Sequence, residues 1–150
     1  MQNTKLAGSE RISYGRLPGV TLLAALAAAL ANALVYFAAS GLGTISQSVL
    51  LPSPMGESPL TVSLVAITSV VGTVGAAIVF ALIGLFARRP LRLFGIIATV
   101  VLVLSFVMPS TVPGVPVAMR LSLAVMHVVA WGVSVGLLTT LARRGKLASA

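Results

Sequence analysis

Four long apolar blocks, separated by short polar or proline-rich segments, dominate the pattern of hydrophobic and polar positions. They cover about residues 20–39, 60–86, 91–108 and 117–141. A helix of about twenty residues rises about 30 Å, which is the thickness of the hydrocarbon core of a bilayer. Apolar stretches of about eighteen or more residues with few charges are typical of membrane spans. The pattern therefore predicts four transmembrane segments.

The secondary structure expected of these blocks is helical. Each block is well above the roughly ten residues of a transmembrane barrel strand, and polar and apolar positions do not alternate along it. In lipid, a helix satisfies its own backbone hydrogen bonds over such lengths. The fold class that we predict is all-α, an integral membrane four-helix bundle.

The first block could instead belong to a cleaved signal peptide. It is longer than the roughly 7–15 apolar residues of a signal core, and it contains Asn32 in its second half. We therefore expect it to be retained as a span. A single transmembrane domain over residues 19–142 follows, with a polar tail at 1–18 and a second tail at 143–150.

Proline-rich segments separate the first block from the second and the third from the fourth. Residues 40–59 contain three closely spaced prolines, which favour extended or turn geometry and predict a loop. The second proline-rich loop is expected to begin at Pro109 and to end at Pro116. A tight basic turn around Arg88 and Pro90 joins the two middle blocks.

The distribution of positive charge predicts the orientation of the spans. Nine of the ten lysines and arginines lie in the two tails and the middle turn, whereas Arg120 begins the fourth block on the opposite side. Under the positive-inside rule, this predicts two antiparallel transmembrane hairpins in a plasma membrane, with both termini cytoplasmic. The nine residues are Lys5, Arg11, Arg16, Arg88, Arg89, Arg92, Arg143, Arg144 and Lys146.

Composition excludes an ordinary soluble domain. Hydrophobic residues make up 58% of the chain and charged residues 8%, against about 25% charged in a typical globular protein. The formal net charge of +8 lies beside apolar blocks, so its expected partner is anionic lipid on the cytoplasmic side and not nucleic acid. There are no cysteines, which removes disulfides and thiolate chemistry.

A few polar residues inside the apolar blocks are candidates for a site. His127 is the only ionisable side chain deep in a span, and such a group is by default a functional hypothesis. Arg120 and Trp131 share its helix face and could line a pocket with it, and Tyr36 could line that pocket or anchor its span. The structural alternative, which we favour, is a neutral His127 bonded to Asn32 or to a backbone carbonyl, with Asn32 joining two helices.

Small residues recur at helical spacing and predict where helices approach closely. The clearest pattern is a GxxxG motif in the fourth block. We favour packing within the bundle over self-association, which stays open. The predicted packing residues are Ala24, Ala28, Gly72, Ala76, Gly132 and Gly136.

Glu57 is the only acidic residue outside the N-terminal tail. It could pair with Arg120 at the outer surface and tie the two outer loops together, with a contribution of about 0–1 kcal/mol for an exposed pair. A single carboxylate cannot form a catalytic pair. No phosphate-binding loop, nucleophile elbow or zinc motif occurs, so we predict no catalytic residue, metal or cofactor.

Several short motifs extend over nearly the whole chain after the tail. They are Asn32 and Tyr36 in the alanine-rich first block, the turn of Arg88, Arg89, Pro90 and Arg92, and the segment from Arg120 to Met126 and His127. Together they resemble a family of small four-span bacterial membrane proteins, mostly actinobacterial, known only as a domain of unknown function. The resemblance implies the same four-span topology and no mechanism.

The functional interpretation that we favour is a non-enzymatic accessory or scaffold component of the membrane. Its partners would be lipids and a partner membrane protein or a second copy of the chain. Two alternatives stay open. One is an oligomeric carrier or channel subunit with a path along Asn32, His127 and Arg120, and the other is a lipid- or quinone-binding enzyme or redox subunit.

Overall fold

The computed structural model describes residues 12–53 and 56–143 of the chain, and it is mostly helical. Four of its helical segments are long and apolar enough to cross a membrane, so the chain is a multi-pass membrane protein. The helices are α1 (Leu17–Gly41), α2 (Val62–Phe86), α3 (Pro90–Ser105), α4 (Val107–Thr111) and α5 (Val117–Leu141). The strands are β1 (Leu50–Ser53) and β2 (Gly56–Pro59).

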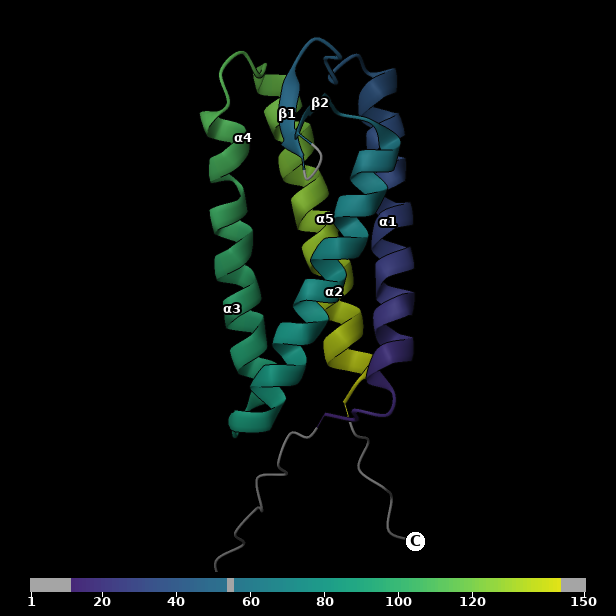
Figure 1. The fold of residues 1–150 in the computed structure, drawn as a ribbon, viewed down its shortest axis with the longest axis vertical. Helices are drawn as coiled ribbons and strands as arrows, with labels where there is room; N and C mark the ends of the chain where they lie inside the picture. Colours follow the sequence, from purple (N-terminus) through teal and green to yellow (C-terminus); the bar gives the residue numbers. More distant parts are fainter. Residues whose placement is uncertain (1–11, 54–55, 144–150) are drawn as a thin grey trace, which may run out of the picture.

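The long helices lie side by side along the longest axis of the molecule (Figure 1). α1 packs along both α2 and α5, while α3 makes far fewer contacts with α2 and α5 on the other side of the bundle. The strands cover one end, here called the ribbon end. The described chain begins and finishes at the other end, here called the terminal end.

The first two long helices begin where local chemistry favours a start. α1 begins at Leu17, ahead of the block expected from residue 20, because Pro18 lies in its first turn, where the missing N–H is not needed. The first helical turn therefore overlaps the expected polar tail. α2 begins at Val62 after Thr61, whose side-chain oxygen accepts a hydrogen bond from the backbone N–H of Leu64 at 3.2 Å.

The expected loop at 40–59 contains an antiparallel two-stranded ribbon. Leu50 pairs with Pro59 and Ser53 with Gly56. The ribbon covers an apolar cluster at the ribbon end, because Leu51 points inward and is buried. The buried members of that cluster are Val49, Leu51, Leu60, Val65, Val115, Met119, Leu123 and Met126.

The third apolar segment extends beyond the predicted end at residue 108. α3 ends at Ser105, Phe106 forms a turn, and α4 continues to Thr111. Pro109, which was expected to open the loop, is the third residue of α4. The expectation failed because the first N–H groups of a helix have no intrahelical partner, so proline is tolerated in the first turn. The fourth segment has the predicted bounds.

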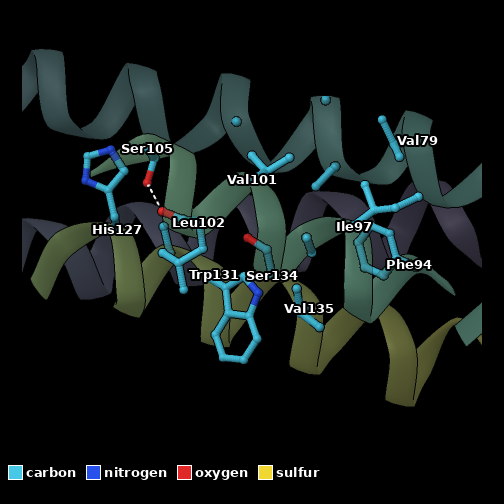
Figure 2. A pocket seen from close by; sticks show the side chains of 15 residues that line it. Val79, Phe94, Ile97, Val101, Leu102, Ser105, His127, Trp131, Ser134 and Val135 are labelled. Atoms are coloured by element: carbon cyan, nitrogen blue, oxygen red, sulfur yellow. Dashed lines mark hydrogen bonds between the residues drawn. The ribbon is translucent and has the colours of Figure 1, made fainter. Parts of the chain in front are cut away.

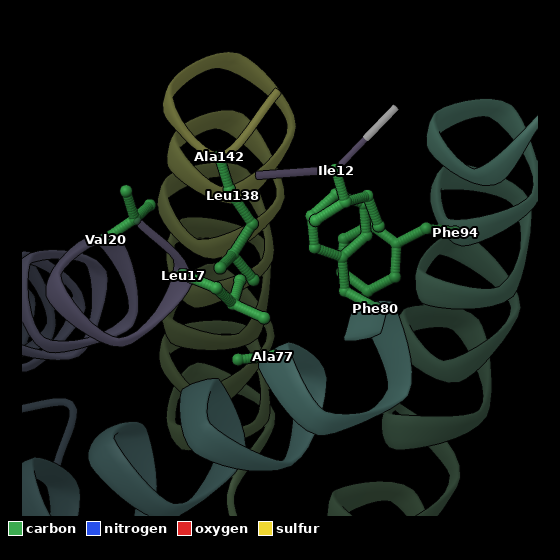
Figure 3. Packing of buried hydrophobic residues seen from close by; sticks show 8 residues of the cluster. All are labelled: Ile12, Leu17, Val20, Ala77, Phe80, Phe94, Leu138 and Ala142. Atoms are coloured by element: carbon green, nitrogen blue, oxygen red, sulfur yellow. The ribbon is translucent and has the colours of Figure 1, made fainter. Parts of the chain in front are cut away.

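Residues 12–16, expected as part of a polar tail, close the terminal end. Ile12 forms a β-bridge with Arg143, and the N–H of Ser13 donates to the Ala142 carbonyl at 2.8 Å. Ile12 covers the two buried rings of Phe80 and Phe94 (Figure 3). The other buried members of this inner cluster are Leu17, Val20, Ala77, Leu138 and Ala142.

Candidate functional site

An apolar groove runs between α3 and the pair formed by α2 and α5 (Figure 2). Its volume is about 340 Å³. Two contacts hold α3 against the bundle, with the groove between them. Near the start of α3, the rings of Phe80 and Phe94 have centroids 4.8 Å apart, and just beyond its end Phe106 meets His127 edge-on at 6.4 Å.

Glycine gives the groove part of its width. Gly72 and Gly75 both line it from α2, and a Cβ added at either would meet no atom within 4 Å. The remaining lining comes from three helices and is mostly aliphatic. It comprises Ala76, Val79, Phe94, Ile97, Ala98, Val101, Leu102, Ser105, His127, Ala130, Trp131, Ser134 and Val135.

The polar side chains of the groove differ in whether they have a hydrogen-bond partner. The Nδ1 atom of His127 lies 2.7 Å from the Leu123 carbonyl oxygen. Because a carbonyl only accepts, Nδ1 carries the proton, and in the neutral ring Nε2 presents a lone pair. The hydroxyl of Ser105 donates to the Leu102 carbonyl at 2.6 Å. The buried indole N–H of Trp131 has no partner among the described residues.

A second, smaller pocket of about 140 Å³ lies between α1, α2 and α5. We call it the polar pocket because Asn32 lines it with its side chain only 4% exposed. Its other lining residues are Leu60, Val65, Thr68, Ser69, Leu123, Met126 and His127.

The hydrogen bonds of Asn32 fix the orientation of its amide. The hydroxyl of Ser69 donates to the Val65 carbonyl at 2.7 Å, so its oxygen accepts from the Nδ2 atom of Asn32 at 2.9 Å. This leaves the Oδ1 atom of Asn32 buried and without a partner among the described residues. Such a buried acceptor is costly unless a donor reaches it.

Among the residues that the structure describes, His127 alone lines both the groove and the polar pocket. Of the expected row, the structure brings His127 and Trp131 together in the groove but leaves Arg120 outside both cavities. The Nε atom of Arg120 is buried without a partner in the described part of the chain. Glu57 is exposed on β2, and within the described part of the chain it forms no ion pair with Arg120. The pairing of Glu57 with Arg120 therefore remains a prediction.

Tyr36 lies near the polar pocket but does not line it. Its hydroxyl donates to the Leu60 carbonyl at 3.3 Å, and its ring meets Phe37 edge-on at 5.7 Å. Farther toward the ribbon end, the hydroxyls of Thr44 and Ser122 lie 2.8 Å apart. These contacts tie α1 to the start of α2 and to α5 above the polar pocket.

The small residues divide into packed and open positions. Ala24 and Ala28 are fully buried in α1, and Ala76 packs against the inner cluster. A Cβ at Gly132 or Gly136 would meet nothing within 4 Å, so no other helix of the described bundle approaches this GxxxG motif closely. The fourth block therefore packs through a different face, and the self-association alternative stays open.

Sequence reasoning missed the hydroxyl pair at the middle of the bundle. Thr73 on α2 and Ser134 on α5 are buried, and their oxygens lie 2.9 Å apart. Ser69 and Thr73 stand four residues apart on one helix face, a spacing that could have indicated a polar seam facing other helices. Ser134 had no such signal within its own block.

The described residues contain one carboxylate side chain, that of exposed Glu57, and no group of three side chains that could hold a metal ion. No curated protein and no solved structure matches the chain. One family model does match, over residues 13–145, which include every residue of the groove and the polar pocket. The chain therefore belongs to DUF6069, a family of unknown function.

Proposed function

We propose that this protein is a non-enzymatic four-span membrane protein that holds the hydrocarbon chain of a membrane-soluble amphiphile in the groove between α2, α3 and α5. The observation that carries the proposal is the groove itself, about 340 Å³ of apolar space with a few polar groups. Small-molecule sites have volumes of about 300–1,000 Å³ and this kind of lining. The role that follows is that of an accessory component that presents or retains a lipid.

The proposed topology is two antiparallel transmembrane hairpins with both termini in the cytoplasm of a bacterial cell. Arg16, Arg88, Arg92 and Arg143 support it, because they flank the helix ends at the terminal end, whereas Arg120 lies at the start of α5 near the ribbon end. The positive-inside rule then assigns the terminal end to the cytoplasm. Anionic headgroups of the inner leaflet are the expected partners of these arginines.

A carrier or channel within one copy is less well supported. The polar contacts between α1, α2 and α5 extend from the ribbon end to the hydroxyls of Thr73 and Ser134. Beyond them, Ala77, Phe80 and Leu138 are buried in the inner cluster and fill the terminal end. A polar solute would therefore meet a packed apolar plug.

The proposal is tested by filling the groove. Gly75→Phe adds a ring where the groove has open space, and Gly132→Phe is the matched control, because Gly132 is also an open helical glycine but lies outside the groove. The full chain is extracted from the membrane, exchanged through mild detergent and weighed intact by native mass spectrometry. We expect one retained lipid-like molecule on the wild type and on Gly132→Phe, and none on Gly75→Phe.

Two results would overturn the proposal. One is equal retention by the wild type and Gly75→Phe, because the bound molecule would then lie elsewhere. The other is an absence of retained small molecules together with a partner protein that Gly75→Phe releases and Gly132→Phe keeps. In that case the groove holds a helix of another chain and not a lipid.

A further inference from the structure

The polar pocket offers almost only hydrogen-bond acceptors. The Oδ1 atom of Asn32 has no partner among the described residues, and Nε2 of neutral His127 presents a lone pair. The hydroxyl of Ser69 already donates to the Val65 carbonyl, and the hydroxyl of Thr68 donates to the Leu64 carbonyl at 2.8 Å. The one spare donor is the second N–H of the Asn32 amide, since its first goes to Ser69.

The polar pocket and the groove follow one another along the same two helices. On α2, Thr68 and Ser69 line the pocket, and Gly72 begins the groove one turn later. On α5, Met126 lines the pocket and Ala130 the groove, with His127 common to both. A molecule whose chain lies in the groove therefore has the polar pocket beside it, with His127 between the two cavities.

We infer that the amphiphile of the proposed function carries a neutral hydroxyl as its head, and that this hydroxyl donates to an acceptor of the polar pocket, either Asn32 or His127. The inference rests on the proposed function and adds the class of ligand, a lipid alcohol. A hydroxyl fits because it donates one hydrogen bond to Asn32 Oδ1 or His127 Nε2. It also accepts one from the spare N–H of Asn32.

Other heads fit the same groups less well. A carboxylate or phosphate head would face lone pairs, and no described lysine or arginine lines the pocket. A carbonyl head, as in a quinone, brings no donor for Asn32 Oδ1. An ammonium head would bring donors but also an unpaired charge into the membrane interior, since no described carboxylate lines either cavity.

The test compares two probes that differ in one donor, dodecanol and dodecyl methyl ether. The full chain is reconstituted in bilayer nanodiscs, and binding is followed through the fluorescence of Trp131, the only tryptophan, which lines the groove. Each signal is corrected for partitioning by the same titration of Gly75→Phe. We expect the alcohol to bind about tenfold more tightly than the ether, the scale of one net hydrogen bond in a dry site.

Variants of the pocket separate its contribution from that of the groove. Asn32→Leu and His127→Phe are each expected to lower the preference for the alcohol toward onefold. Because Asn32 lies outside the groove, Asn32→Leu should also leave binding of the ether unchanged. Thr99→Val is the matched control. Thr99 is an exposed threonine of α3 outside both cavities, and its hydroxyl bonds only within its own helix.

The outcomes distinguish the two proposals. Equal affinity of the wild type for both probes overturns the hydroxyl head and leaves the groove intact. So does tighter binding of dodecanoate than of dodecanol. A Trp131 response that is the same in the wild type and in Gly75→Phe, for every probe, overturns the groove itself. The comparison of probes on the wild type stands even if a pocket variant does not fold.

Discussion

The hydroxyl oxygens of Thr73 on α2 and Ser134 on α5 lie 2.9 Å apart in the middle of the bundle. Thr73 also donates to the Ser69 carbonyl one turn away at 2.8 Å. Because Thr73 has a single hydroxyl proton, Ser134 is the donor of the bond between them. This bond is the polar link between α2 and α5, which otherwise make few contacts.

Removal of both hydroxyls should cost less stability than the sum of the two single removals. We expect Thr73→Val and Ser134→Ala each to lower the free energy of unfolding by about 1 kcal/mol, and the double variant to lose less than the sum. The coupling energy should be about 0.5–1.5 kcal/mol, measured by steric trapping in bicelles as a double-mutant cycle. Strictly additive losses would show that the hydroxyls do not act as a pair.

The helical membrane fold was predictable because lipid imposes a simple rule. A long apolar run must satisfy its own backbone hydrogen bonds, so length and hydropathy predict helices, and this prediction is confirmed. Proline was a poorer guide. Pro109 lies in the first turn of a short helix, because the chain turns at Phe106 and a new helix begins after it. No local sequence pattern indicates the turn at Phe106.

The candidate site was predictable only in part. Asn32 was expected to meet another helix, and it meets Ser69. The groove was not foreseeable, because it depends on where α3 contacts its neighbours. The burial of Ile12 was likewise hidden, since a single apolar residue in a polar segment has no periodicity.

Gly84 should be required for the closure of the terminal end. A Cβ there would collide with Ile12 and lie 2.7 Å from the Tyr14 hydroxyl oxygen. We expect Gly84→Leu to displace residues 12–16 and to lower the free energy of unfolding by about 1–3 kcal/mol. Hydrogen exchange at the amide of Ser13, which donates to Ala142, should become faster.

The control for Gly84 is Gly95→Leu. Gly95 is a helical glycine of α3 with nothing within 4 Å of its Cβ position, so leucine there should be tolerated. If Gly84→Leu leaves exchange at Ser13 as slow as in the wild type, the segment at 12–16 is not seated against α2.

The proposed topology predicts the labelling of two single-cysteine variants, since the natural chain has no cysteine. Ser48→Cys lies at an exposed position near the ribbon end, and Ala87→Cys lies in the basic turn after α2. In intact cells, a membrane-impermeant maleimide should label Ser48→Cys and leave Ala87→Cys unlabelled until the cells are lysed. The reverse pattern would place the terminal end outside the cell.

The packing of α3 against the bundle should depend more on Phe94 than on any lipid-facing residue of α3. Phe94 is buried and meets Phe80 at a ring tilt of 50°. Phe94→Ala removes that contact, so we expect the free energy of unfolding to fall by about 0.5–1.5 kcal/mol, the scale of an aromatic pair. The start of α3 should also move away from α2.

The movement of α3 can be measured by spin-label distances between α3 and α2 in nanodiscs. The matched control is Leu93→Ala, one residue earlier on the exposed face of α3, which should leave both the distance and the stability unchanged. The contact between Phe80 and Phe94 bounds the groove on the side of the terminal end. Phe94→Ala should therefore widen the groove, and the protein should retain its lipid less well during detergent exchange. An unchanged distance in Phe94→Ala would mean that α3 is held by the contact of Phe106 with His127 alone.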